Sequence, residues 1–195
     1  MRFLAIPALS IFFFFLSAAA PLAQAPTSTN TGSPFGQPNI IRPAARSQYD
    51  VWTGAILYNT TNGKIFKNGI TTDVTTLLTF EYPAATAGLQ CEFHFYLDPT
   101  ATLAGTGTFD VFSSLAPATQ STTSWPPGNQ RNQFEGRIQA AEPGEAIFLP
   151  GYGNTAQLYN CPTGQTLGME LVPTGDYDDI EWVGKLAGAY ILYHS

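Results

Sequence analysis

Histidine is the side chain best suited to general acid–base chemistry near neutral pH, and this sequence contains two, His94 and His194. His94 lies between Glu92 and Tyr96 on the polar side of an alternating stretch, where either neighbour could orient its ring. His194 is the penultimate residue of the chain. A serine hydrolase also needs a nucleophile beside the histidine, and the sequence has no G-x-S-x-G motif. We therefore expect His94 to be a surface or partly packed residue rather than a catalytic base.

Paired carboxylates are a second kind of chemistry, because glycoside hydrolysis needs two of them facing each other across a cleft. Glu92 and Glu170 both fall on predicted strands. As a catalytic pair they would support an alternative function, that of a carbohydrate-active hydrolase. Scattered glutamates are also typical of the solvent faces of any acidic β protein. We therefore expect that the chain is not an enzyme.

Four carboxylates lie in or just after the turn at residues 173–176, and they are Asp176, Asp178, Asp179 and Glu181. Hard oxygen ligands on a turn suit Ca²⁺, but the spacing does not match an EF-hand loop. A hydrogen-bonded turn with solvated acids is the simpler interpretation, and calcium binding stays open as the alternative. Two histidines on separate strands are too few ligands for a zinc site, so we expect no cofactor.

Aromatic side chains supply a third kind of chemistry, because exposed flat rings can stack on sugars. Three of them lie in turn-rich stretches and are the candidates for ligand binding: Trp125, Tyr152 and Tyr159. Binding residues are often found in loops, but aromatic side chains also build cores. For Trp125, which precedes two prolines, both interpretations stay open. Trp182 shares a strand face with Ile180, and we expect it in the core.

The first residues indicate the compartment. A positive start at Arg2, an apolar stretch over 3–16 and small residues over 17–20 form the pattern of a secretory signal peptide, which we assign to residues 1–19. The apolar stretch is shorter than the roughly 20 residues that span a bilayer, and no second one follows, so we expect no membrane span. The sequence thus predicts a secreted protein, either extracellular or associated with a cell wall.

Secretion changes the interpretation of two cysteines and one asparagine. In an oxidising compartment we expect Cys91 and Cys161 to form a disulfide rather than remain as two free thiols. A bridge that closes a loop of about 70 residues is worth roughly 4 kcal/mol in the chain-entropy model. Asn59 begins the sequon Asn59-Thr60-Thr61 and is a candidate for N-glycosylation.

The elements that must position these residues are short strands. The stretch from Cys91 to Leu97 alternates most clearly, with apolar residues on one face and polar residues on the other. Turn signals separate about eight or nine such stretches, and no window sustains a helical period. The pattern predicts an all-β fold, a β-sandwich or jelly roll, in a single domain over 49–195. A Pro-, Thr- and Ser-rich linker is expected over 20–48.

Several stretches carry a family resemblance through their order and spacing. They are TTLLTF at 75–80, the strand at 91–97, FDVF at 109–112, PAT at 117–119, WPPGNQ at 125–130, CP at 161–162, GMELVP at 168–173 and EW at 181–182. Together they resemble the C-terminal domain of the fungal ubiquitin 3 binding protein family, But-two. The resemblance implies a β-rich domain that is often found behind a signal peptide in filamentous fungi. It implies no catalytic residues, and the binding of a ubiquitin-like activating enzyme, to which the family's name refers, is an intracellular task.

The formal net charge of −6 at pH 7 disfavours nucleic acid as a partner, because an acidic chain repels the phosphate backbone. The leader, the disulfide and the strand pattern instead predict a secreted β-sandwich protein, and the family resemblance implies a fungal one. We expect it to be a non-catalytic binding or structural module at the cell wall or in the extracellular or host space. Its expected partner is a cell-wall glycan or a host or other extracellular protein.

Overall fold

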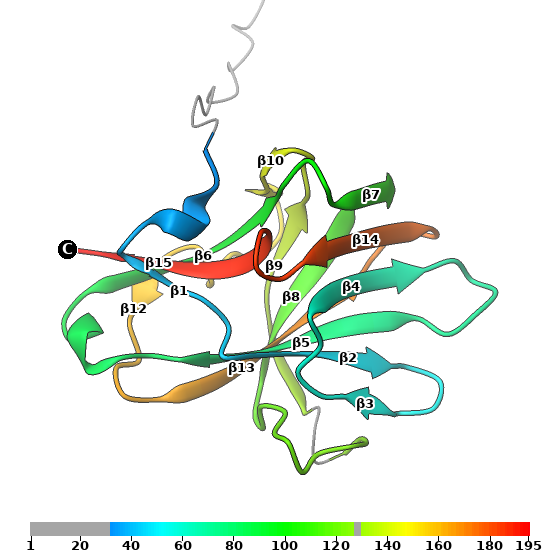
Figure 1. Cartoon of the computed structure of the whole chain (residues 1–195), viewed down its shortest axis with the longest axis horizontal. Coiled ribbons are helices and arrows are strands. Elements are labelled where there is room, and N and C mark those ends of the chain that lie inside the picture. Colours follow the sequence, from blue (N-terminus) through cyan, green and yellow to red (C-terminus); the bar gives the residue numbers. More distant parts are fainter. Residues whose placement is uncertain (1–31, 127–129) are drawn as a thin grey trace, which may run out of the picture. The chain divides into compact units, whose positions relative to one another are not determined.

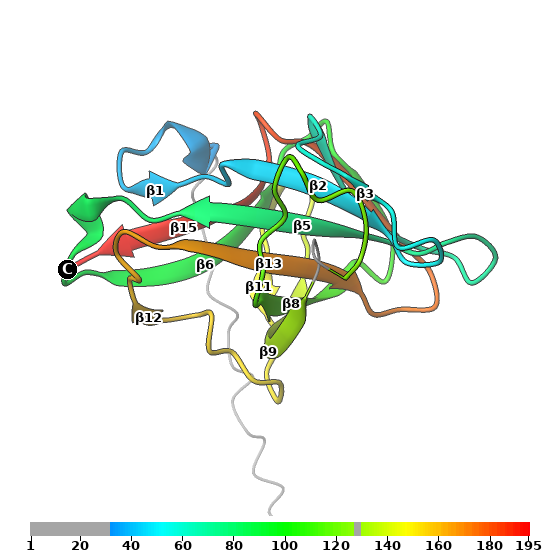
Figure 2. The same cartoon turned by 90° about the horizontal axis from the view of Figure 1, so that it is seen from below.

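The computed structural model describes residues 32–126 and 130–195, and this part of the chain folds into an all-β domain with two antiparallel sheets (Figure 1, Figure 2). The smaller sheet is made of β1 (Ile40–Ile41), β6 (Gln90–Leu97), β10 (Gly144–Glu145), β12 (Tyr159–Asn160) and β15 (Gly188–His194). Its order is β1-β15-β6-β10, and β12 also pairs with β6.

The larger sheet contains ten strands and curls into a half-barrel, which confirms the predicted sandwich-like architecture. Its strands are β2 (Ala45–Asp50), β3 (Ile56–Leu57), β4 (Asn62–Lys67), β5 (Val74–Glu81), β7 (Thr102–Gly105), β8 (Thr108–Ser114), β9 (Arg131–Gln139), β11 (Ile147–Phe148), β13 (Thr166–Pro173) and β14 (Asp178–Val183). Their order is β11-β9-β8-β13-β5-β4-β14-β7, and β2 pairs with both β5 and β3.

The sequence predicts about eight or nine strands and the structure has fifteen in its described residues, and the lengths of the strands explain the difference. Within the described residues, nine strands have six or more residues, and these carry the sandwich. The other six have only two to four residues. A strand this short cannot be recognised from its sequence, because a run of two to four residues is too short to show alternation between apolar and polar side chains.

The core lies between the two sheets. From β6 of the smaller sheet, the Phe95 ring packs edge-on against Phe109 of β8 at 4.8 Å and against Trp182 of β14 at 5.1 Å. The alternation predicted for β6 is confirmed, since Cys91, Phe93, Phe95 and Leu97 are all buried in this core. Trp182 is buried beside Ile180, again as predicted. Contacts of this kind hold the sheets together, because removing one buried aromatic ring typically costs about 3–5 kcal/mol.

Two glycines make room for the largest of these side chains. Gly63 of β4 lies directly opposite Trp182 in the β4–β14 ladder. A Cβ atom at Gly63 would overlap the Trp182 indole, and a Cβ at Gly188 would do the same from the start of β15. The core therefore depends on the missing side chains at these two positions.

A second, smaller cluster covers the opposite face of β5. Leu77 points away from the main core and packs with Ile56 of β3 and with Ala118. The loop over 115–126 is held there by its backbone, because the amide of Ile56 donates to Thr123 O at 2.9 Å and the amide of Trp125 donates to Gly54 O at 2.8 Å. This attachment places Trp125 on the outer face of the larger sheet, the face turned away from the smaller sheet.

The predicted disulfide is confirmed between Cys91 of β6 and Cys161, which follows β12. The two Cα atoms are 5.1 Å apart, and the residues are 70 positions apart in sequence. The bridge therefore fastens the segment after β12 to the smaller sheet. It closes a long loop, for which the chain-entropy model gives about 4 kcal/mol of stabilisation.

The domain begins earlier than the predicted boundary at residue 49, so the linker expected over 20–48 is wrong for its second half. Residues 40–41 form β1, which pairs with β15, and residues 45–50 form β2, which pairs with β5. The Phe35 ring also packs against Tyr190 at 5.7 Å. A Pro-rich composition did not prevent this pairing, because edge strands need few residues and tolerate flanking prolines. Residues 20–31 of the linker and the signal peptide assigned to 1–19 lie outside the described residues.

Helical structure is limited to two 3₁₀ turns in the described ranges, η1 (Pro34–Gly36) and η2 (Ala84–Thr86). Over the same ranges, no helix has the length and apolar character that crossing a membrane requires.

Candidate functional site

The outer face of the larger sheet presents side chains that alternate with core residues. On β8, Phe109 and Val111 are buried in the main core, so Asp110 and Phe112 lie on the outer face. Glu170 of β13 is the registered neighbour of Phe112. Strand alternation thus brings charged and aromatic groups together on this face.

Glu170 is fully buried although it lies on the outer face. Arg131 of β9 reaches across β8 to it and donates from Nε and Nη2 at 2.8 and 2.9 Å, while the Thr75 hydroxyl donates at 2.7 Å. The hydrogen bonds with Glu170 raise the pKa of the Arg131 guanidinium. The same guanidinium lies over the Phe112 ring, 4.8 Å from its centroid. Glu170 therefore serves to hold an arginine in place beside an aromatic ring.

Trp125 lies at one end of this arrangement. Together with Tyr49 and Arg131 it lines an open groove of about 430 Å³. Its side chain is 60% exposed even though its backbone is hydrogen-bonded to Gly54. An exposed ring on a fixed backbone can stack on a ligand with little loss of conformational freedom.

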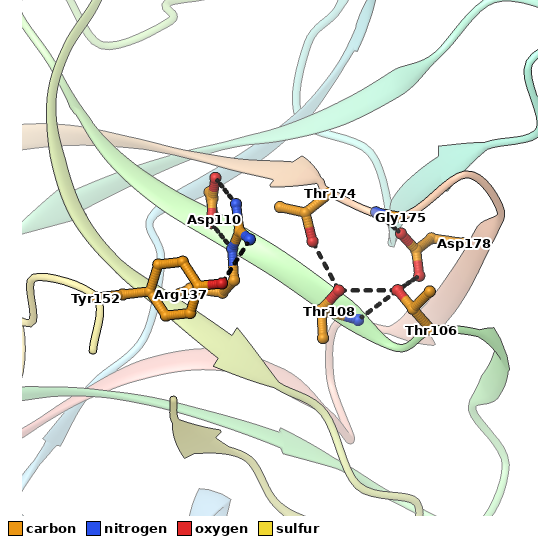
Figure 3. A network of polar contacts seen from close by, with 8 residues as sticks. All are labelled: Thr106, Thr108, Asp110, Arg137, Tyr152, Thr174, Gly175 and Asp178. Atoms are coloured by element: carbon orange, nitrogen blue, oxygen red, sulfur yellow. Dashed lines mark hydrogen bonds and ion pairs between the residues drawn. The ribbon is translucent and has the colours of Figure 1, made fainter. Parts of the chain in front are cut away.

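Tyr152 lies at the other end. Figure 3 shows its ring beside the Arg137 guanidinium. Arg137 of β9 forms a bidentate pair with Asp110 of β8, with Nε and Nη2 at 2.7 and 3.0 Å from the carboxylate oxygens. This pair raises the pKa of Arg137. The guanidinium lies 4.4 Å from the centroid of the Tyr152 ring and donates to its hydroxyl at 3.2 Å. Tyr152 is thereby fixed with 44% of its surface exposed.

Between these two ends, the Phe112 ring meets Phe134 of β9 edge-on at 5.6 Å. We call the five aromatic side chains that line this face the aromatic strip: Tyr49, Phe112, Trp125, Phe134 and Tyr152. Both arginines that touch the strip have a carboxylate partner, so the strip carries no unbalanced charge within the part of the chain that the structure describes. A neutral surface with several flat rings and phenol hydroxyls suits stacking on sugar rings.

Only two of the three aromatic candidates from the sequence belong to this strip. Tyr159 of β12 is instead half-buried, and its hydroxyl lies 2.8 Å from that of Tyr82. Burial raises the pKa of the Tyr159 phenol, and the neighbouring Tyr82 raises it further. Tyr159 lines a separate pocket of about 290 Å³ whose other walls include Leu167 and Met169. The structure thus separates Tyr159 from Trp125 and Tyr152.

The acidic turn is organised by hydrogen bonds (Figure 3). Asp178 is fully buried and accepts from the amides of Gly107 and Gly175 at 2.9 and 2.8 Å and from the Thr106 hydroxyl at 2.5 Å. Strand alternation places Asp178 and Asp179 on opposite faces of β14. Glu181 of the same strand forms an ion pair with Lys64 of β4, and Asp176 is exposed. In the two described ranges, no three His, Cys, Asp or Glu side chains are placed to hold a metal ion.

Both histidines of the chain meet at one carboxylate on the smaller sheet. Glu92 lies 3.1 Å from His94 Nε2 and 3.0 Å from His194 Nε2. Burial opposes ionisation of Glu92, but the hydrogen bonds with His194 and His94 outweigh it and lower the pKa of the Glu92 carboxyl. The hydrogen bond to Glu92 in turn raises the pKa of His194. The sequence indicated that Glu92 could orient His94, but only the pairing of β15 with β6 brings His194 to the same carboxylate.

The carboxylates considered for a hydrolase are not brought together. Glu92 belongs to β6 of the smaller sheet, whereas Glu170 belongs to β13 of the larger sheet. Glu92 is occupied by two histidines and Glu170 by an arginine and a threonine. Two carboxylates in these positions do not flank a common cleft, which glycoside hydrolysis requires.

The sequon asparagine, Asn59, is exposed on the turn between β3 and β4. Its φ of 54° lies in the left-handed region, which asparagine tolerates better than most residues. The position is thus accessible to a glycosyl group, and its glycosylation stays a prediction.

Several members of the aromatic strip were not identified from the sequence. Alternation with the core residues Phe109 and Val111 could have placed Phe112 on the outer face. Phe134 has the same parity as the buried Ile138, and it reaches this face only because the β8–β9 register shifts between Val111 and Phe112. Tyr49 is the first residue of the predicted domain, and nothing in its local sequence indicates the groove beside Trp125.

A comparison with curated proteins gives no match. A family model described as the Ubiquitin 3 binding protein But2 C-terminal domain matches residues 37–186. The matched range contains β1 to β14, both cysteines of the disulfide and every residue of the aromatic strip. This match covers well over half of the chain and agrees with the resemblance seen in its sequence, so the chain belongs to the But2 C-terminal domain family.

Proposed function

We propose that this But2-family domain is a non-catalytic binding module that acts outside the cell and holds a neutral polysaccharide of the cell wall on its aromatic strip. The observation that carries the proposal is the exposed Trp125 ring at the end of a charge-balanced row of aromatic side chains.

The chemistry of the strip favours neutral sugars. The apolar faces of sugar rings stack on flat aromatic side chains, while their hydroxyls need donors and acceptors such as a tyrosine hydroxyl. Trp125 and Tyr152 provide such rings at the two ends, and Arg137 orients the Tyr152 hydroxyl. A charged polymer would gain little here, because Arg131 and Arg137 already have bidentate carboxylate partners.

The non-catalytic part of the proposal rests on the placement of the carboxylates. Glu92 and Glu170 lie on different sheets, and Glu170 is held by Arg131 and Thr75. These positions favour binding over glycoside hydrolysis.

The extracellular location is supported by two independent features. One is the predicted signal peptide over residues 1–19. The other is the Cys91–Cys161 disulfide, a type of bond that persists in oxidising compartments and is rare in the cytosol. An intracellular task such as binding a ubiquitin-related protein would require the reducing compartment, where this bond is not maintained.

Retention on insoluble polysaccharides tests the proposal. The mature protein should co-sediment with at least one of chitin, β-glucan and cellulose. Trp125→Ala and Tyr152→Ala should each weaken retention about fivefold to tenfold, since one stacked ring contributes about 1–1.5 kcal/mol.

Tyr177→Ala is the matched control, because Tyr177 is an exposed aromatic residue on the turn between β13 and β14, outside the aromatic strip. It should leave retention unchanged. Absence of retention on all three polymers would refute the glycan proposal and leave an extracellular protein as the partner to be sought. Equal losses for Tyr177→Ala and Trp125→Ala would also contradict it.

A further inference from the structure

Three cationic side chains gather at an open groove that is separate from the aromatic strip. Arg42 lies between β1 and β2, Arg46 lies on β2, and Lys185 follows β14. Together with the turn at 59–62 they line a groove of about 620 Å³. Lys185 is far from the two arginines in the sequence, so the three cations are brought together only by the folding of the chain.

The two guanidinium groups meet at one backbone oxygen. Arg42 Nη2 donates to Gly184 O at 2.5 Å, and Arg46 Nη2 donates to the same oxygen at 3.3 Å. Arg46 Nη1 also donates to Thr61 O at 3.4 Å. A Cβ atom at Gly184 would overlap the Arg46 guanidinium, so a side chain at position 184 would force the Arg46 side chain to move.

No carboxylate balances this charge. Among the described residues, no Asp or Glu forms an ion pair with Arg42, Arg46 or Lys185, and none lines the groove. Residues 1–31 and 127–129 contain no Asp or Glu at all. Arg131 and Arg137, by contrast, each have a bidentate carboxylate partner. The formal net charge of the chain is −6, so a groove with three cations and no carboxylate differs from the acidic character of the chain as a whole.

Burial and the nearby charge of Arg42 both disfavour the protonated form of Arg46. Burial lowers the pKa of its guanidinium, and repulsion from Arg42 lowers it further. Its Nε is buried and makes no hydrogen bond within the described structure. Holding two like charges together without a counter-charge is unfavourable, and an anion bound between them would remove that penalty.

We propose that the groove formed by Arg42, Arg46 and Lys185 is a binding site for a phosphate-type oxyanion. Arginine forks match the oxygens of a phosphate group, and a lysine adds a point charge. Three cations suit a dianion better than the single charge of a carboxylate. The phosphate can come from a phosphorylated sugar or from free inorganic phosphate. The groove uses none of the residues of the aromatic strip, so this proposal is independent of the neutral-polysaccharide proposal.

Isothermal titration calorimetry of the mature protein tests the site with four probes: inorganic phosphate, glucose 6-phosphate, glucose and acetate. The natural sequence is produced in a bacterial periplasm, where the disulfide can form and no N-glycan is added at Asn59, which lines the groove. Both phosphates should bind, whereas glucose and acetate should bind at least tenfold more weakly. Tighter binding of glucose 6-phosphate than of inorganic phosphate would identify a phosphorylated sugar as the source, and the reverse order would identify the free ion.

Single substitutions distinguish a specific phosphate site from nonspecific attraction of an anion to positive charge. Arg42→Gln and Lys185→Gln, both at exposed positions, should each weaken phosphate binding about tenfold, as expected for a lost charge-assisted contact. Arg46→Lys keeps the charge but loses the fork and should also weaken binding. Lys67→Gln is the matched control, because Lys67 is a cation without an ion pair in the described structure and lies outside the groove. Absence of phosphate binding, or equal losses for Lys67→Gln and Arg42→Gln, would overturn the proposal.

Discussion

Arg131 and Glu170 form a bidentate ion pair that spans β8, with Nε and Nη2 of the arginine 2.8 and 2.9 Å from the two carboxylate oxygens. The carboxylate is fully buried, whereas the arginine side chain remains 40% exposed. The pair therefore links a buried charge to the surface on which Trp125 and Phe112 lie.

Replacing Arg131 with alanine should destabilise the domain strongly, because it leaves the Glu170 carboxylate buried without its cation. We expect a loss of about 3 kcal/mol in the free energy of unfolding, at the lower end of values for broken buried pairs because Arg131 is partly exposed. Guanidinium chloride denaturation measures this loss. The double variant Arg131→Ala/Glu170→Ala should lose less than the sum of the single variants, and additive losses would contradict the coupling.

The Glu92–His194 contact should stabilise the domain only within a window of pH. The raised pKa of His194 means that its contribution is present below its ordinary value of 6.5 and is lost as the pH rises through the folded-state pKa. The lowered pKa of Glu92 means that its contribution is present above its ordinary value of 4.5 and is lost as the pH falls through the folded-state pKa. The contact should therefore be strongest between pH 4.5 and 6.5.

Melting temperatures of the natural protein and of His194→Gln, measured from pH 3 to pH 9, check this window. The difference between the two proteins should peak inside it and shrink on both sides. His94, Glu145 and Tyr190 also belong to this cluster, with His94 stacked on Tyr190 at 5.1 Å and Tyr190 donating to Glu145 at 2.7 Å. Burial raises the pKa of Glu145, but that effect is present in both proteins and cancels in the difference. A difference independent of pH would refute the prediction.

Loss of the Cys91–Cys161 bridge should lower the free energy of unfolding by about 4 kcal/mol, since the bridge closes a long loop of the unfolded chain. Denaturation with and without dithiothreitol measures the change, and intact mass confirms that two thiols have been released. The double variant Cys91→Ala/Cys161→Ala should match the reduced protein and should not respond to the reductant. A protein equally stable in both redox states would contradict a structural role for the bridge.

Gly63→Ala should destabilise the core, because the new Cβ would overlap the Trp182 indole. Overpacking of this kind costs about 1–3 kcal/mol and should appear as a lower denaturation midpoint with a shifted tryptophan emission. Gly153→Ala is the control, since a Cβ there meets only ordinary contacts with Phe134 at 3.8 Å. Similar midpoints for the two variants would show that the Trp182 site can relax.

Much of the fold could be predicted from local patterns. The alternation from Cys91 to Leu97 identified a strand and its core face, and Trp182 was assigned to the core by its spacing from Ile180. An even number of cysteines after a predicted leader was enough to expect the disulfide. These features depend on the period of two in a strand or on simple residue counts, and both are visible along the chain.

The candidate sites depended on which strands become neighbours, and only the tertiary structure decided that. Arg131 meets Glu170 because β9, β8 and β13 are adjacent in the sheet, and Arg46 meets Arg42 and Lys185 because β2 and the end of β14 border one groove. Strand pairing in an antiparallel sheet is set by contacts between distant parts of the chain, which leave no local pattern. The sequence by itself therefore determined the class of fold, the family and the disulfide, whereas the tertiary structure decided which side chains share a surface and which charges are balanced.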